Sequence, residues 1–215
     1  MSIEKKYKYI KEGLLIIISS PSGAGKSTLC QILASKDKNI FLSVSSTTRK
    51  KRKSEIHGKH YKFIDNKKFN LMKKNDEFIE HAKVFGNLYG TPAKNTISKI
   101  RNGVDVLFDI DWQGAKQIRK KFSQHIVDIF IMPPNIKELR KRLNKRGQDK
   151  KDIVERRMKM AISEMNHYNE YKYVLFNNKI NETIRNIKNI IVIERNLRKN
   201  LLKIRNIINR NKDNY

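Results

Sequence analysis

The chain has 215 residues, 38% of them hydrophobic and 8% aromatic, which excludes a wholly disordered protein and allows one domain with a buried core. Lys and Arg number 48 against 21 Asp and Glu, and the net charge of +27 favours anionic partners such as nucleotides, nucleic acids or acidic lipid surfaces. A coding bias toward Lys, Asn and Ile is an alternative explanation of this charge, so basicity alone selects no function.

The first predicted strand covers residues 13–19, and a helix is predicted over 26–35. Between strand and helix lies the segment Ser20-Pro21-Ser22-Gly23-Ala24-Gly25-Lys26-Ser27-Thr28. It is typical of a nucleotide phosphate loop, although the strict pattern has glycine at position 20. The glycines let backbone N–H groups surround phosphate oxygens, Lys26 can reach the β- and γ-phosphates, and the Ser27 hydroxyl can bind Mg²⁺. An ordinary strand-to-helix turn is the alternative interpretation.

A second strand is predicted over 41–45, and it ends in hydroxyl residues that precede Arg49 and Arg52. Hydroxyl and guanidinium groups at the C-terminal end of a strand are what an α/β sheet uses to hold an anionic ligand. The region from 55 to 91 then changes character, with strands predicted over 60–64 and 78–84, a helix over 65–75 and a turn over 87–91. We interpret it as an insertion over the sheet.

Four polar side chains mark this insertion, namely Tyr61, Glu80, Tyr89 and Thr91. Taken alone, the two tyrosines are more typical of half-buried packing residues, and Glu80 could be an exposed strand carboxylate. A helix is predicted next over 96–102, followed by an apolar strand over 104–111 that carries Asp109 and Asp111 near its end. Because alternate strand residues share a face, we expect both carboxylates to point the same way, toward the water shell of a Mg²⁺ ion.

The remaining chain continues the alternation of helices and strands. Helices are predicted over 113–121, 136–144, 152–169 and 181–208, and strands over 126–131 and 173–177. The region from 136 to 169 is dense in arginine, which by default indicates a solvated helical face. The pattern predicts an α/β fold with a parallel sheet flanked by helices, and the phosphate loop, the arginines after strand two and the two aspartates all fall at its C-terminal edge.

Five segments resemble the guanylate kinase family in order and spacing: 21–28 (PSGAGKST), 45–49 (SSTTR), 78–80 (FIE), 89–91 (YGT) and 109–114 (DIDWQG). The likeness extends over about 13–198. It implies a P-loop kinase-type fold, with a core of about 13–44, 92–135 and 170–208, a small mixed α+β GMP-binding insertion of about 45–91 and a helical lid of about 136–169. It also implies transfer of a phosphoryl group from ATP to GMP or dGMP with Mg²⁺.

The resemblance assigns roles to individual residues. The GMP pocket it implies consists of Ser45, Arg49, Arg52, Glu55, Tyr61, Glu80, Tyr89, Thr91 and Asp111. The ATP side consists of Ser22, Gly23, Ala24, Gly25, Lys26, Ser27, Thr28 and Asn177, and the metal residues are Ser27 and Asp109. Phosphoryl transfer would rest on Lys26, Arg49, Arg142, Arg146 and Arg157. The chain departs from the family's pattern at Lys50-Lys51 and at Ser54, which leaves the role of Glu55 less secure than that of Arg49.

Elementary chemistry agrees with these roles. An acceptor phosphate is already ionised at neutral pH, so no general base is required and the protein has only to bring two polyanions together. Guanine presents an N1–H and an amine side by side, and a carboxylate such as Glu80 accepts from both, whereas adenine offers no such pair.

Three alternatives stay open at this point: a guanylate-kinase-like scaffold domain that binds peptides, a basic nucleic-acid-binding protein, and another small-molecule kinase of the same superfamily. The single cysteine, Cys30, excludes an intramolecular disulfide. The first twelve residues lack the features of a signal peptide, and no apolar run reaches the ~18 residues of a membrane span. We therefore expect a cytoplasmic protein with no specific nucleic-acid or membrane partner, and leave the oligomeric state open.

Overall fold

Five parallel strands form the main sheet of the computed structural model, which describes residues 13–122, 126–145 and 151–212. In spatial order they are β2 (Ile40–Leu42), β7 (Asp105–Asp109), β1 (Leu15–Ser19), β8 (Ile126–Met132) and β9 (Tyr173–Phe176). All five residues of β1 are buried, because helices cover both faces of the sheet. The predicted parallel α/β fold is therefore confirmed.

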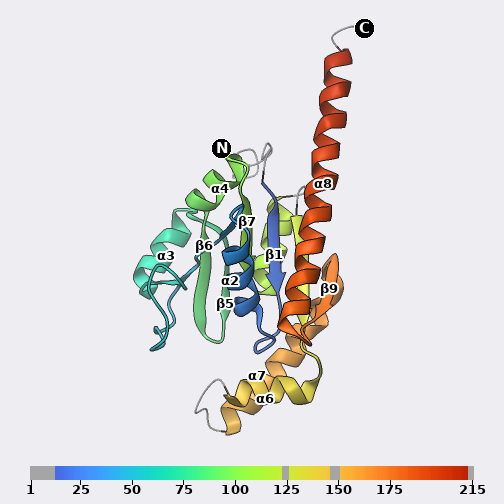
Figure 1. Ribbon diagram of the computed structural model, residues 1–215. Coiled ribbons are helices and arrows are strands. Elements are labelled where there is room, and N and C mark those ends of the chain that lie inside the picture. Colours follow the sequence, from blue (N-terminus) through green and yellow to red (C-terminus); the bar gives the residue numbers. More distant parts are fainter. Residues whose placement is uncertain (1–12, 123–125, 146–150, 213–215) are drawn as a thin grey trace.

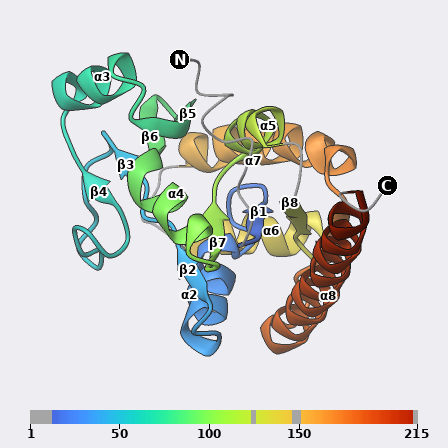
Figure 2. The same ribbon diagram turned by 90° about the horizontal axis from the view of Figure 1, so that it is seen from above.

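Each face of the main sheet has its own hydrophobic cluster (Figure 2). On one face, α4 (Ala93–Arg101) and α5 (Trp112–Lys121) contribute Ile100 and Ile118. On the other face, α2 (Lys26–Lys36) and α8 (Ile180–Lys212) contribute Leu29 and Ile187. Cys30 is buried in this second cluster as a small apolar residue.

A second, mixed sheet forms the insertion, beside α3 (Asn66–Lys74) (Figure 1). Its spatial order is β4 (Lys62–Phe63), β3 (Ser46–Thr47), β6 (Asn87–Pro92) and β5 (Phe78–Val84). The turn predicted over 87–91 is wrong, since these residues form β6. The chain reverses instead at Phe85 and Gly86, both with positive φ. Gln117 of α5 donates to the carbonyl of His81 at 2.6 Å and so fastens β5 to the core.

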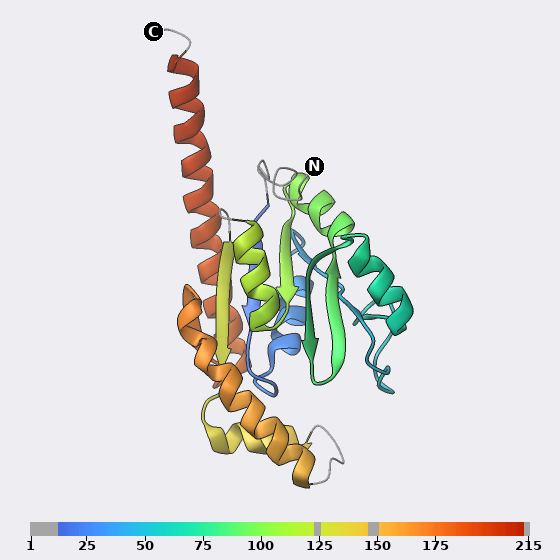
Figure 3. The same ribbon diagram turned by 180° about the vertical axis from the view of Figure 1, so that it is seen from behind.

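The region predicted as a lid contains α6 (Ile136–Lys145), α7 (Lys151–Met165) and the 3₁₀ helix η1 (Asn166–Glu170). Figure 3 shows α6 and α7 beyond the C-terminal ends of the main strands. The two helices share a small apolar cluster that includes Leu139, Leu143 and Met158. The helix predicted over 152–169 is correct in position, but its last turn is 3₁₀ from Asn166 onward.

Several boundaries differ from those predicted. The strand predicted over 41–45 ends at Leu42, and the one predicted over 104–111 ends at Asp109, because Asp111 caps α5 instead. The helix predicted over 96–102 begins at Ala93. The last helix, α8, runs from Ile180 to Lys212, and its second half projects beyond the rest of the molecule (Figure 1). Within the described ranges, no helix is long and apolar enough to cross a membrane.

Candidate active site

The phosphate loop is shaped by what packs against it. Gly23 and Gly25 have φ values of 93° and 99°, which side chains other than glycine rarely adopt. A Cβ at Gly23 would lie 3.0 Å from methyl groups of Leu139 and Leu143, and one at Gly25 would lie 2.7 Å from the amide nitrogen of Asn177. The loop therefore needs glycine both for its backbone and for its contacts with α6 and the end of β9.

Asn177 holds the loop rather than projecting freely into solvent. Its buried amide donates to the carbonyl of Ala24 at 2.8 Å and accepts from the Thr183 hydroxyl at 3.1 Å. Arg142 reaches the same place from α6, with its guanidinium 3.5 Å from the Ala24 carbonyl oxygen and 3.4 Å from that of Asn177. A cavity of about 320 Å³ opens here, lined by Gly23, Gly25, Thr28, Arg142, Asn177, Asn178 and Ile180.

Lys26 forms an ion pair with Asp109, which brings the first turn of α2 to the end of β7. Burial opposes the charge on Lys26, but the Asp109 carboxylate outweighs this effect and raises the pKa of the lysine above its ordinary value. The Ser27 hydroxyl is half-buried in the same helical turn. Asp109 and Asp111 do not act as the same-face pair that we expected, because the strand ends between them.

Glu164 is a site residue that the sequence did not reveal. From α7, its carboxylate accepts a hydrogen bond from the backbone N–H of Ser22 at 2.9 Å, within the phosphate loop. Burial raises the pKa of Glu164, and the neighbouring Asp111 adds to this effect. The residue lies in a polar helix without any motif, and only the contact across 142 positions of the chain identifies it.

A group of arginines and tyrosines occupies the insertion. Arg49 donates to Glu55 at 2.6 Å, and the other oxygen of Glu55 accepts from the backbone N–H of Arg52 at 2.8 Å. Burial opposes ionisation of Glu55, but its bonds to Arg49 and to the Arg52 backbone lower its pKa overall. Glu55 therefore orients the Arg49 guanidinium and holds the backbone at Arg52, whose own side chain is largely exposed.

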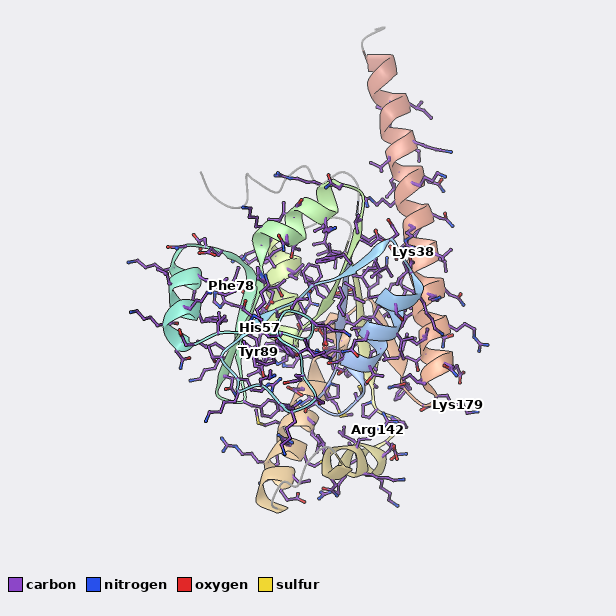
Figure 4. The ribbon with its side chains drawn as sticks, turned by 60° about the vertical axis from the view of Figure 1, so that its left-hand side comes forward. Lys38, His57, Phe78, Tyr89, Arg142 and Lys179 are labelled. Atoms are coloured by element: carbon purple, nitrogen blue, oxygen red, sulfur yellow. The ribbon has the colours of Figure 1, made fainter. Side chains whose placement is uncertain are left out.

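The two tyrosines contact each other and Arg49. Their rings meet edge-on with centroids 5.8 Å apart, and the Arg49 guanidinium lies 5.5 Å from the centroid of Tyr61. Burial, assisted by Asp109, raises the pKa of Tyr61 to about 12, so its hydroxyl stays protonated at neutral pH. Figure 4 shows Tyr89 in the insertion and Arg142 by the lid helices. Tyr61 thus lies within electrostatic reach of the Lys26–Asp109 pair.

Glu80 is a buried carboxylate with few partners. Its side chain is 2% exposed and accepts from the Thr91 hydroxyl at 2.6 Å, while that hydroxyl lies 2.9 Å from the hydroxyl of Ser45. Burial and the nearby Asp111 raise the pKa of Glu80 to about 7. A Cβ at Gly114 would lie 2.5 Å from a Glu80 oxygen, so α5 must present glycine at this point.

Three predicted residues remain, namely Asp111, Arg157 and Arg146. Asp111 accepts from the backbone N–H of Gly114 at 2.9 Å as the N-cap of α5. Arg157 is half-buried on α7. Arg146 lies outside the described residues. Across the described ranges, no group of three or more His, Cys, Asp or Glu could hold a metal ion.

Ser27 and Asp109 nevertheless offer the hard oxygen donors that Mg²⁺ prefers. Magnesium commonly binds through one or two protein oxygens together with substrate phosphates, rather than in an all-protein cage. The donor set therefore fits Mg²⁺ delivered with a nucleotide.

Comparisons with known proteins cover most of the chain. A sequence model of a family described as guanylate kinase matches residues 12–194. The guanylate kinase of Ruegeria pomeroyi is 48% identical over 186 residues, which are 86% of this chain and 87% of that protein. The guanylate kinase of Buchnera aphidicola subsp. Schizaphis graminum is 47% identical over 188 residues, with 86% and 90% covered.

A solved structure agrees with the sequence comparisons. The crystal structure of guanylate kinase from Anaplasma phagocytophilum superposes with a TM-score of 0.73 at 41% sequence identity. The superposition covers 86% of this chain and 87% of that one. The likeness thus includes the parallel sheet, and the family match begins before the phosphate loop and ends within α8.

Proposed function

The chain belongs to the guanylate kinase family, which phosphorylates GMP with ATP to give GDP, and we propose how the residues described above divide this work. The phosphate loop holds ATP, the insertion holds GMP or dGMP, and the lid closes over the phosphoryl group in transit. We take about 45–91 as the insertion, about 136–169 as the lid and the rest of 13–208 as the core of a single domain. The buried Glu80 carboxylate is the observation that best supports this division.

On the donor side, the backbone from Ser22 to Thr28 cradles the ATP phosphates. Lys26 exchanges Asp109 for the β- and γ-phosphates, because the lysine is charged and already lies at the helix N-terminus. Ser27 and Asp109 would hold a Mg²⁺ ion, which when bound would neutralise charge on the phosphates. Asn177 serves ATP indirectly by fixing the Ala24 carbonyl.

On the acceptor side, Arg49, Arg52, Tyr61 and Tyr89 bind the GMP phosphate. Arg49 is oriented by Glu55, and the Tyr61 hydroxyl remains a donor at neutral pH because burial raises its pKa to about 12. The acceptor phosphate attacks as an ionised oxygen, so no base has to remove a proton. This explains how the reaction can proceed with none of the histidines assigned a role.

Guanine is selected by Glu80, with Ser45, Thr91 and Asp111 around it. An ionised Glu80 accepts from the guanine N1–H and amine together, and the Thr91 hydroxyl keeps the carboxylate in one orientation. GMP thereby supplies the hydrogen-bond donors that the buried carboxylate lacks. AMP offers no matching donor pair and would leave the charge uncompensated.

The lid contributes Arg142, Arg146 and Arg157, which neutralise charge on the transferring group as it moves. Arg142 already lies by the phosphate loop in the structure. We propose that the partners are small molecules and not nucleic acid, because every residue assigned above serves a nucleotide. We also propose that the reaction takes place in the cytoplasm.

A coupled assay with GMP, dGMP, AMP, UMP and CMP as acceptors tests this proposal. The wild type should use GMP and dGMP and neglect the other three. Glu80→Gln should lower kcat/KM for GMP by about 100-fold and leave the KM for ATP within about twofold, because only the acceptor contact changes. Glu77→Gln, an exposed carboxylate three residues away, is the matched control. Equal losses for GMP and ATP in Glu80→Gln would refute the assignment.

A further inference from the structure

The projecting half of α8 carries an exposed apolar stripe, which we call the distal stripe. It consists of Ile193, Leu197, Leu201, Ile204, Ile207 and Ile208, each between 50% and 62% exposed. At about 100° per residue, these six positions fall within an arc of roughly 120°. The residues that fasten α8 to the sheet, Ile184, Ile187 and Ile191, are buried and lie on another side of the helix.

The same segment is strongly basic. Residues 195–212 contain seven Lys and Arg and neither Asp nor Glu. Arg195 is held by the body of the protein through Asp37 and Asp105, but Lys199 and Lys203 are exposed beside the distal stripe. The helix therefore combines an apolar face with unbroken positive charge, which is the pattern of helices that lie in a membrane interface.

A second copy of the chain fits this surface poorly. Heptad spacing covers only Leu197, Leu201, Ile204 and Ile208, about two heptads, whereas coiled coils are indicated by three or four. The preceding position of the pattern is Glu194, which is buried and bonded to Lys172 and Tyr173. Two such helices would also bring like charges together, with no acidic residue in 195–212 to pair with them.

Nucleic acid would match the charge but leave the apolar stripe in water. An anionic lipid surface complements both, since its head groups pair with lysine and its acyl boundary covers leucine and isoleucine. Figures 1 and 3 show the distal half of α8 and the lid at opposite ends of the molecule. Contact through α8 would thus leave the nucleotide site open to solution. The family match ends at residue 194, so all of this surface except Ile193 lies beyond the family domain.

We propose that residues 193–208 of α8 lie flat in the surface of an anionic lipid bilayer and tether the kinase there. The segment is about 24 Å long as a helix and is too basic to span the bilayer, so the attachment is peripheral. This proposal differs from our expectation of no membrane partner. It does not depend on how the active-site residues divide their roles.

Co-sedimentation of the full chain with vesicles tests the tether. Binding is expected to vesicles of phosphatidylcholine mixed with phosphatidylglycerol, and not to phosphatidylcholine alone. Leu201→Glu should weaken binding by about 10- to 100-fold, because it removes a buried leucine from the interface. Leu71→Glu on α3 is the matched control, since Leu71 is 57% exposed and Leu201 is 62% exposed. It should bind like the wild type.

A second pair of variants tests the charge. Lys199→Gln with Lys203→Gln should weaken vesicle binding by about 30-fold, since each lysine near an anionic surface contributes about a fivefold factor. Lys67→Gln with Lys74→Gln, two exposed lysines of α3, should have little effect. All variants should keep solution phosphotransfer, which also shows that they fold.

Three results would overturn the tether. One is absence of wild-type binding to the anionic vesicles, and another is equal loss in Leu201→Glu and Leu71→Glu. The third is a dimer in sedimentation equilibrium that Leu201→Glu converts to monomer while vesicle binding is unchanged, which would assign the stripe to a second copy.

Discussion

The two proposed nucleotide sites differ in how their charges are balanced without ligand. At the phosphate loop, Lys26 is paired with Asp109, and the loop carbonyl of Ala24 is bonded to Asn177. In the insertion, Glu80 has a hydroxyl partner and, among the described residues, no ion pair; burial raises its pKa to about 7, and the more distant Lys121 only partly offsets this. The donor site is thus satisfied in advance, whereas the acceptor site keeps a destabilising charge that its ligand can satisfy. We therefore assign the selectivity between nucleotides to the acceptor site, where the unliganded protein carries the destabilising charge.

The largest expected effect is the loss of phosphoryl transfer when the phosphate-loop lysine is replaced. Lys26→Met should lower kcat by on the order of 10³-fold or more, because it removes the cation that stabilises charge on the transferring phosphoryl group. Rate measurements at saturating ATP and GMP check this. Lys36→Met, an exposed lysine at the other end of α2, should retain wild-type rates. Full activity in Lys26→Met would remove the phosphate-loop mechanism.

The next effect concerns the stability of the acceptor side. Because the folded-state pKa of Glu80 is raised from 4.5 to about 7, its stabilising contribution is fully present below pH 4.5 and is lost as pH rises through 7. Glu80→Gln should therefore raise the free energy of unfolding at pH 8 by about 2–3 kcal/mol, and by much less at pH 5. Urea titrations at both pH values measure this difference. A destabilised Gln variant at pH 8 would contradict the account.

The same pKa predicts an asymmetry between the two substrates. If GMP binds ionised Glu80 as proposed, its KM should rise about tenfold per pH unit below pH 7, after allowance for titration of the GMP phosphate. The KM for ATP should lack this step. In Glu80→Gln the KM for GMP should lose the dependence attributable to the carboxylate. Parallel slopes in wild type and variant would assign the titration to another group.

The smallest expected effect is a rise in the KM for ATP when the residue that supports the phosphate loop is replaced. Asn177→Ala should raise the KM for ATP by about fivefold, because it leaves the Ala24 carbonyl with only the long contact from Arg142. The KM for GMP should change less. Asn196→Ala, an exposed asparagine on α8, provides the control. Equal increases for both substrates would show that Asn177 supports the fold as a whole rather than the loop.

The residues of the proposed donor site can be recognised in the sequence more directly than those of the proposed acceptor site, for a physical reason. A phosphate loop is built mainly from consecutive backbone N–H groups, so its residues stand together in the chain, as do Gly23, Gly25 and Lys26. The pocket around Glu80 is built from β3, β5, β6 and α5, and only the resemblance to a family brought Ser45, Thr91 and Asp111 together before the fold was known.

Other features could not be predicted because they depend on tertiary contacts. Glu164 reaches Ser22 across 142 positions, and nothing in its helix indicates that contact. The strand β6 was mistaken for a turn because Asn87 and Gly90 favour turns locally, whereas pairing with both β3 and β5 holds them extended. The second half of α8 was predicted as a helix, but its projection from the body follows only from the packing of its first half.

The central claim is that Glu80 is the uncompensated buried carboxylate that GMP satisfies. Carbon-13 NMR of selectively labelled glutamate, with Glu80→Gln used to assign the resonance, measures the pKa of this group directly. We expect a value of about 7 in the free protein and a fall of at least about one unit on saturation with GMP, but not with AMP. A pKa that is ordinary in the free protein, or one that GMP leaves unchanged, would contradict the account.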